Sequence, residues 1–181
     1  MTGVRKKLKL SLETQKLIEL LKDFHTLTGM RIVIFDADYQ EILAYPESHC
    51  SFCEVMHSNK QTGSYCRESN EKSFAHCRKS GELMVYRCHA GLIEATAPLK
   101  DNGVIIGYTM FGQLTDIEDS AVLLCSIHEN CQTYQLETKL DDTVIMSITY
   151  KNHEQIKAAA KIMEACTFYV LHKDMLHMEK I

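Results

Sequence analysis

The sequence contains no long apolar run, no phosphate-binding loop and only two prolines. No stretch approaches the roughly 18 consecutive apolar residues that a membrane span requires, and the basic N-terminus lacks the apolar core of a secretory signal. The motifs Gly-x-x-x-x-Gly-Lys-Ser/Thr, Gly-x-Gly-x-x-Gly, Gly-x-Ser-x-Gly and His-Glu-x-x-His are all absent from the sequence. We therefore expect a cytoplasmic protein that is not an enzyme, with mostly reduced cysteines and no membrane contact.

The charge balance of the chain argues against a nucleic-acid surface. Its formal net charge is −4, and the one basic run, at residues 5–9, lies at the extreme N-terminus, where it reads as a solvated tail. Phosphate binding needs a clustered positive face, which the rest of the sequence does not suggest. The 181 residues, 45% of them hydrophobic, are enough for one domain with a normal core and an accessory helix.

Hydrophobic periodicity and turn residues predict the order of the elements. The expected helices cover 12–27, two segments between 53 and 80 broken near Gly63, 116–128, and a long segment from Asn152 or His153 to about Met178. The expected strands cover 31–35, 41–44, 83–88, 93–100 and 104–113. Asp101-Asn102-Gly103 is a strong hairpin turn, because Asn and Gly tolerate positive φ. The pattern is weak between residues 130 and 150.

This order predicts an α+β fold with the general plan of PAS-like sensory domains. We expect a five-stranded antiparallel sheet with helices packed on one face, plus N-terminal and long C-terminal helices. The expected division is a tail at 1–12, the sensory domain at 13–150 and a connector helix at 151–181. The connector has a wide apolar face, which favours a homodimer seam, although packing on its own domain would explain the same pattern.

Five of the eight cysteines fall between Cys50 and Cys88. Cys50-Ser-Phe-Cys53 is a C-x-x-C, a spacing at which two thiolates can share a metal ion, but no second pair completes a zinc motif. The motif is not predicted to lie in a βαβ unit, which argues against a thioredoxin-like role. Metal binding, redox sensing and simple burial in a core or pocket all remain open from spacing alone.

Two further segments carry polar groups beside glycines. In the segment 86–94, His89 and Glu94 could bind a small polar ligand, although a histidine bound to backbone and a surface carboxylate are the ordinary alternatives. In the segment 107–113, the glycines suit close approach of another group, and Gln113 offers both a donor and an acceptor. An edge-strand bend would also account for this second segment.

The combination of these segments resembles the PocR-type sensory domain over roughly residues 13–175. The matching motifs are Ser51-Phe52-Cys53, Cys66, Tyr86-Arg87-Cys88-His89-Ala90-Gly91-Leu92-Ile93-Glu94-Ala95-Thr96-Ala97-Pro98-Leu99, Ile106-Gly107 and Phe111-Gly112-Gln113. The family pattern includes Cys53, Cys66 and Cys88, together with His89, Glu94 and Gly112-Gln113. Cys50 and Cys77 lie outside it, and the C-x-x-C therefore looks incidental.

The resemblance implies a PAS-like sensory module of bacterial AraC-type regulators or histidine kinases that binds a small hydrocarbon derivative such as a diol. We expect cavity walls and polar contacts from seven residues: Phe35, Phe52, Tyr86, His89, Glu94, Phe111 and Gln113. The alternative is a metal or redox sensor in which Cys53, Cys66 and Cys88 converge on zinc or another thiolate-bound metal. In either case a DNA-binding or kinase output domain is the expected partner.

Overall fold

The computed structural model of the protein describes residues 12–133 and 140–178. The basic run expected to be a tail lies outside these residues. The elements are α1 (Leu12–Thr28), β1 (Arg31–Asp36), β2 (Glu41–Tyr45), α2 (Ser51–Ser58), α3 (Lys60–Ser80), β3 (Met84–Arg87), β4 (Ile93–Asp101), β5 (Val104–Thr115), α4 (Ser120–Thr133), α5 (Asp142–Met146), β6 (Thr149–Tyr150) and α6 (His153–Met178).

The strands form one sheet in the order β2-β1-β5-β4-β3, and each of these neighbours is antiparallel. The predicted α+β fold with a five-stranded antiparallel sheet is therefore confirmed. The turn between β4 and β5 has φ of 50° at Asn102 and 80° at Gly103, as the hairpin prediction requires. The two-residue strand β6 adds a sixth, parallel partner to β5. It falls in the stretch where the sequence pattern is weak.

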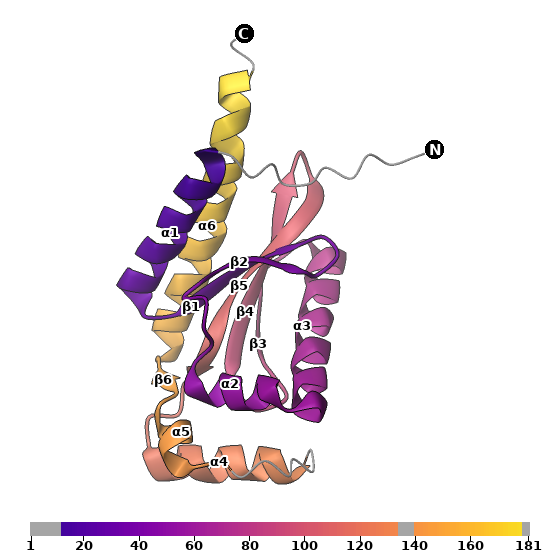
Figure 1. The fold of residues 1–181 in the computed structure, drawn as a ribbon. Helices are drawn as coiled ribbons and strands as arrows, with labels where there is room; N and C mark the ends of the chain where they lie inside the picture. Colours follow the sequence, from indigo (N-terminus) through magenta and orange to yellow (C-terminus); the bar gives the residue numbers. More distant parts are fainter. Residues whose placement is uncertain (1–11, 134–139, 179–181) are drawn as a thin grey trace.

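Helices cover both faces of the sheet (Figure 1). Helices α2 and α3 lie on one face, while α1 and α6 run side by side on the other. Alternation along β1 separates the two sides, because Ile32 and Ile34 pack toward α1 and α6, whereas Val33 and Phe35 pack toward α3. The prediction placed helices on one face and left the terminal helices unassigned; these supply the second layer.

The first half of α6 belongs to the core of the domain. Ile156, Ala159, Ala160 and Met163 are buried against the sheet and α1. Their spacing follows one helical face, as the sequence pattern indicated. For this part of the helix, packing on its own domain explains the apolar face, as the alternative to a dimer seam. Among the described residues, none of the helices combines the length and apolar character that a bilayer crossing requires.

The two helices after β2 are joined at Asn59 and not near Gly63. The Asn59 side chain accepts from the backbone N–H of Gln61 at 2.9 Å and of Thr62 at 3.4 Å, which caps α3. A Cβ at Gly63 would lie 3.2 Å from the backbone oxygen of His57, so this glycine lets the helices approach closely. Gly81, with φ of 72°, ends α3 as predicted.

A third layer closes one end of the sheet, where α4 and α5 lie beneath α2 (Figure 1). The predicted helix at 116–128 begins four residues later, at Ser120. Asp119 accepts from the N–H groups of Ala121 and Val122 at 2.9 and 3.0 Å, which fixes that start. Asp116 instead forms an ion pair with Arg87 at 2.7 Å.

Candidate functional site

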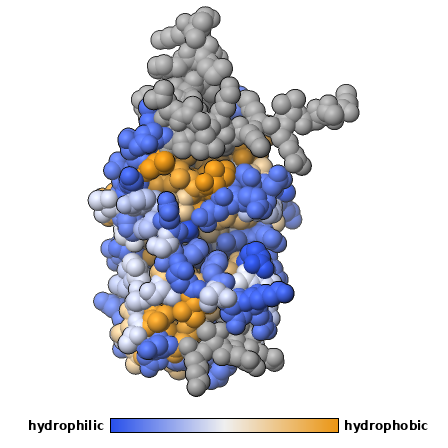
Figure 2. Space-filling model, viewed as in Figure 1, coloured by the Kyte–Doolittle hydropathy of each residue, from blue (hydrophilic) through white to orange (hydrophobic). Residues whose placement is uncertain are grey.

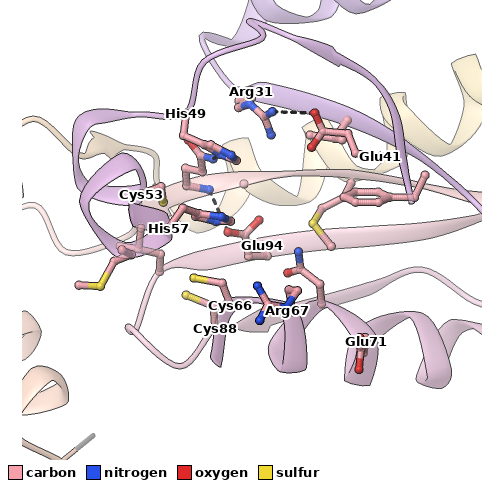
Figure 3. A pocket seen from close by; sticks show the side chains of 18 of the residues that line it. Arg31, Glu41, His49, Cys53, His57, Cys66, Arg67, Glu71, Cys88 and Glu94 are labelled. Carbon is pink, nitrogen blue, oxygen red and sulfur yellow. Dashed lines mark hydrogen bonds and ion pairs between the residues drawn. The ribbon is translucent and has the colours of Figure 1, made fainter. Parts of the chain in front are cut away.

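A cavity of about 330 Å³ lies between the sheet and the helices α2 and α3. Its walls come from β1, β4, β5, both helices, the hairpin between β1 and β2, and the loop after β3 (Figure 3). This volume falls near the lower end of the range for small-molecule pockets. The cavity combines apolar walls with a few converging polar side chains, which is the usual composition of a ligand site.

Most of the sequence-predicted site residues line this cavity. The predicted ligand contacts found there are Phe35, Phe52, His89, Glu94 and Gln113, and the predicted metal ligands found there are Cys53, Cys66 and Cys88. They come from distant parts of the chain, which the antiparallel sheet and the fold-back of α3 bring together. Whether any of them contacts a ligand remains a prediction.

Two residues that were predicted as cavity walls, Phe111 and Tyr86, are not among those that line this cavity. Phe111 points to the opposite face, is fully buried and packs on Phe24 of α1 with ring centroids 5.7 Å apart. Its neighbour Met110 takes the cavity side instead, because adjacent strand residues alternate. Tyr86 packs against α3, and its hydroxyl donates to Asn70 Oδ1 at 3.3 Å. It therefore supports a lining residue without reaching the cavity.

The centre of the site is a β-bulge in β5. Ile93 pairs with Leu114 and Ala95 with Phe111, so Gly112 and Gln113 together oppose Glu94. A Cβ at Gly112 would meet the Glu94 carboxyl oxygen at 1.7 Å, so the carboxyl occupies the space that any side chain there would need. Gln113 has φ of 65°, a conformation that a non-glycine residue seldom adopts and that often marks functional sites.

Glu94 is a carboxyl held in a poorly solvated position at this bulge. Desolvation raises its pKa to about 8, opposed by the backbone N–H of Gln113, which donates to Oε1 at 3.4 Å. The group is consequently protonated at neutral pH, and it can donate a hydrogen bond as well as accept one.

The side chain of Gln113 connects the bulge to the wall of the cavity through hydrogen bonds. Its Oε1 accepts from the backbone N–H of Cys50 at 2.7 Å, and its Nε2 donates to His49 Nδ1, also at 2.7 Å. His49 in turn stacks on His57 with ring centroids 4.3 Å apart. Gln113 was predicted to contact ligand, but both ends of its amide are engaged within the protein. These bonds position the segment that enters α2, and contact of Gln113 with a ligand stays a prediction.

The cavity is lined by several groups that sequence reasoning missed: Arg31, His49, His57 and Met110. Arg31 is the least expected of these, because it stands at the start of an apolar strand and is only 9% exposed. Its guanidinium forms an ion pair with Glu41 at 3.3 Å and donates to the carbonyls of Pro46 and Glu47, each at 3.1 Å. The inward direction of Arg31 depends on strand register, which no local motif reveals.

The three histidines of the cavity are predominantly uncharged at neutral pH. Burial, together with the nearby Arg31 and His57, lowers the pKa of His49 to about 4. Burial is also the leading cause of the lowered pKa values of His57 and His89. Uncharged imidazoles offer both a donor and an acceptor, so they suit hydroxyl recognition better than anion binding.

The three predicted metal ligands line the cavity but do not group into a metal site in the described part of the chain. Burial raises the pKa of Cys66 to about 11 and that of Cys88 to about 12, and Glu94 adds to both shifts. Within residues 12–133 and 140–178, no group of three or more His, Cys, Asp or Glu side chains could hold a metal ion. Cys53, Cys66 and Cys88 therefore act as apolar, protonated wall groups in this arrangement.

Comparison with known proteins supports a sensory role. A family model described as the sensory domain found in PocR matches residues 11–175. The regulatory protein PocR of Salmonella typhimurium (strain LT2) is 29% identical over 104 residues, which cover 58% of this chain and 34% of that protein. The chain thus spans about a third of the length of this curated relative.

Two solved structures show weaker similarity. One is a GAF domain/HD domain protein from Geobacter sulfurreducens, with a TM-score of 0.40 and 12% identity over 72% of this chain and 99% of that chain. The other is an IclR homolog complexed with 4-hydroxybenzoate from Microbacterium hydrocarbonoxydans, with a TM-score of 0.35 and 9% identity over 77% and 72% of the two chains. At these values, nothing about ligand or mechanism follows from either structure.

Proposed function

We propose that this chain, which belongs to the PocR sensory-domain family, binds a small uncharged polar molecule such as a diol in the cavity beside Glu94. The observation that supports this proposal is the placement of the Glu94 carboxyl and three imidazoles among apolar wall residues. Burial raises the pKa of Glu94 and lowers the pKa values of the three histidines, so these lining groups are largely uncharged at neutral pH and can exchange hydrogen bonds with hydroxyls.

The cationic groups of the cavity do not favour an anionic ligand. Arg31 is already paired with Glu41 and with two backbone carbonyls. Arg67 lines the cavity from an exposed position on α3, beside Cys66 (Figure 3). A carboxylate ligand would also lie near Glu94, whose ionised form is disfavoured there. These contacts support an alcohol or diol over the corresponding acid.

Ligand titration followed by thermal unfolding tests the proposal. A propanediol has few heavy atoms, and a ceiling of about −1.5 kcal/mol per non-hydrogen atom limits its affinity to micromolar at best. Millimolar propanediol should raise the unfolding temperature, whereas lactate and propionate at the same concentrations should not. The Glu94→Gln variant should retain most of this response and Glu94→Ala should lose it. Equal stabilisation by diol and acids would contradict the proposal.

For the output, we infer an AraC-type DNA-binding domain in the full-length protein. The support is the regulatory role named for the curated relative, whose length this chain covers only in part.

We further propose a homodimer through α1 and α6, because Leu27 is 75% and Ile162 is 41% exposed on these neighbouring helices. Figure 2 shows apolar side chains gathered in limited areas of an otherwise hydrophilic face. Sedimentation velocity of Ile162→Glu tests the assembly, and an unchanged dimer would contradict this seam.

A further inference from the structure

The pair Cys50 and Cys53 lies at the start of α2, where Cys53 lines the cavity and Cys50 precedes the first turn of the helix. Cys50 is the N-cap residue, with extended φ and ψ of −65° and 156°, and its carbonyl accepts from Glu54 N–H at 2.9 Å. Cys53 is the third residue of the helix. Side chains at these two positions reach each other across the first turn, and C-x-x-C at a helix N-terminus is an arrangement in which reactive dithiols occur.

The two thiols differ in access to solvent. Cys50 is partly exposed, whereas Cys53 is 9% exposed and faces the cavity (Figure 3). An exposed attacking thiol beside a buried second thiol is the usual division of roles in reversible dithiols. The Cys50 backbone is held by Gln113 Oε1, so the pair has a fixed position relative to the bulge.

We propose that Cys50 and Cys53 form a reversible redox dithiol that responds to small-molecule disulfides at the cavity wall. The cavity lining would then carry two inputs, a ligand and the oxidation state of this pair. The dithiol chemistry itself does not depend on which ligand is bound.

The surroundings of the pair favour Cys50 as the attacking group. The Cys53 thiol, the N–H groups of the first turn and the nearby Arg31 together lower the pKa of Cys50 to about 7. The same contact with Cys50 and burial raise the pKa of Cys53, to which Glu94 adds. Cys50 is therefore substantially ionised at neutral pH while Cys53 keeps its proton.

The reaction is thiol–disulfide exchange with a low-molecular-weight disulfide, RSSR. Cys50 loses its proton to solvent, and its thiolate attacks one sulfur of RSSR to form a mixed disulfide while RS⁻ leaves and is protonated. Cys53 then loses its proton and attacks Sγ of Cys50, which forms the intramolecular disulfide and releases a second RSH. The protein loses two electrons and two protons, and RSSR is reduced to two thiols.

The sequence makes this reaction easy to follow. Tryptic cleavage after Arg31 and Lys60 yields a peptide, 32–60, that contains Cys50 and Cys53 and no other cysteine. After incubation with oxidised glutathione at pH 7, acid quenching and alkylation under denaturing conditions, this peptide should be about 2 Da lighter than the dithiol and unalkylated. In Cys53→Ser, Cys50 should retain a glutathione adduct. In Cys66→Ser, the disulfide should form as in the unaltered chain.

Alkylation rates provide a second measurement that does not require a stable disulfide. In the native chain Cys50 should react with N-ethylmaleimide at least about tenfold faster at pH 7 than the exposed Cys125, with a rate midpoint near pH 7. The proposal is overturned if peptide 32–60 stays fully reduced while Cys125 is glutathionylated. It is also overturned if Cys53 pairs with Cys66 or Cys88 instead, or if Cys50 reacts no faster than Cys125.

Discussion

The two faces of the sheet are built for different purposes, although the same strands supply both. On the face covered by α1 and α6, the core is mainly apolar, with Ile34, Phe111 and Met163 among its buried members, and the buried Thr109 of β5 also lies there. On the face covered by α2 and α3, the strands present Arg31 and Glu94 to a cavity of about 330 Å³. One side therefore supplies packing energy, while the other leaves space and places polar groups where water is scarce.

Removal of one phenylalanine from each face tests whether the two sides of the sheet are packed differently. Phe111→Ala should lower the free energy of unfolding by about 3–5 kcal/mol, because it opens a void in a closed apolar core. Phe35→Ala should lower it by at least about 1 kcal/mol less, since Phe35 already borders the cavity and is 8% exposed, whereas Phe111 is fully buried. Urea titration of both variants measures the difference. Equal losses would mean that the cavity face is packed as tightly as the other.

The same pair of residues shows what could be predicted from the sequence. Strand positions, the Asn102-Gly103 turn and most cavity residues follow from local pattern and from the family resemblance. Ile32 pairs with Phe111 and lies on the face covered by α1. Once this register was known, the alternation of side chains along β5 would have excluded Phe111 from the cavity lining. Register itself depends on contacts between distant segments, which is why local reasoning misplaced this residue.

The polar centre was less accessible to prediction. The glycine and glutamine of the family motif were recognised, but not that they form a bulge opposite Glu94. Bulges insert a residue without an obvious sequence signal, and here the insertion turns the Gln113 amide toward the entry to α2. Arg31 and the stacked pair His49 and His57 were missed for a related reason, because they reach the cavity through tertiary contacts only.

The buried carboxyl of Glu94 should make the stability of the protein depend on pH. The pKa of Glu94 rises from 4.5 to about 8 on folding, so between these values the folded state holds a proton that the unfolded state has lost. The contribution of Glu94 to the free energy of unfolding should therefore be greatest below pH 4.5. Between pH 4.5 and pH 8 it should fall by up to about 1.4 kcal/mol per pH unit, and above pH 8 it should level off. Glu94→Gln removes this contribution.

The measurement is urea unfolding of the unaltered chain and Glu94→Gln between pH 5 and pH 9. The variant should gain stability relative to the unaltered chain as pH rises, and the two curves should run parallel above about pH 8. Glu82→Gln is the matched control, because Glu82 is exposed in the loop before β3. Curves for Glu94→Gln and the unaltered chain that stay parallel throughout would show that Glu94 is solvated and that the polar face is ordinary.

The smallest expected effect comes from Gly112, which lies on the cavity side of β5 directly against the Glu94 carboxyl. Gly112→Ala should lower the free energy of unfolding by about 1–3 kcal/mol, because the added methyl overlaps the Glu94 carboxyl, which would have to leave the position where Gln113 N–H donates to it. The backbone at Gly112 does not require positive φ, so strain in the strand does not account for this loss. The displaced carboxyl should also weaken the response to propanediol.

A double-mutant cycle separates this steric cause from a general intolerance of side chains in the bulge. In a Glu94→Ala background the methyl at position 112 has room, so Gly112→Ala should cost about 1 kcal/mol less than in the unaltered chain. In a Glu82→Ala background its cost should be unchanged. An undiminished cost beside Ala at position 94 would place the constraint in the bulge backbone, and Gly112 would then serve the shape of β5 rather than the position of the carboxyl. A diminished cost would show that this glycine is what allows a carboxyl to lie inside one face of a sheet whose other face is mainly apolar.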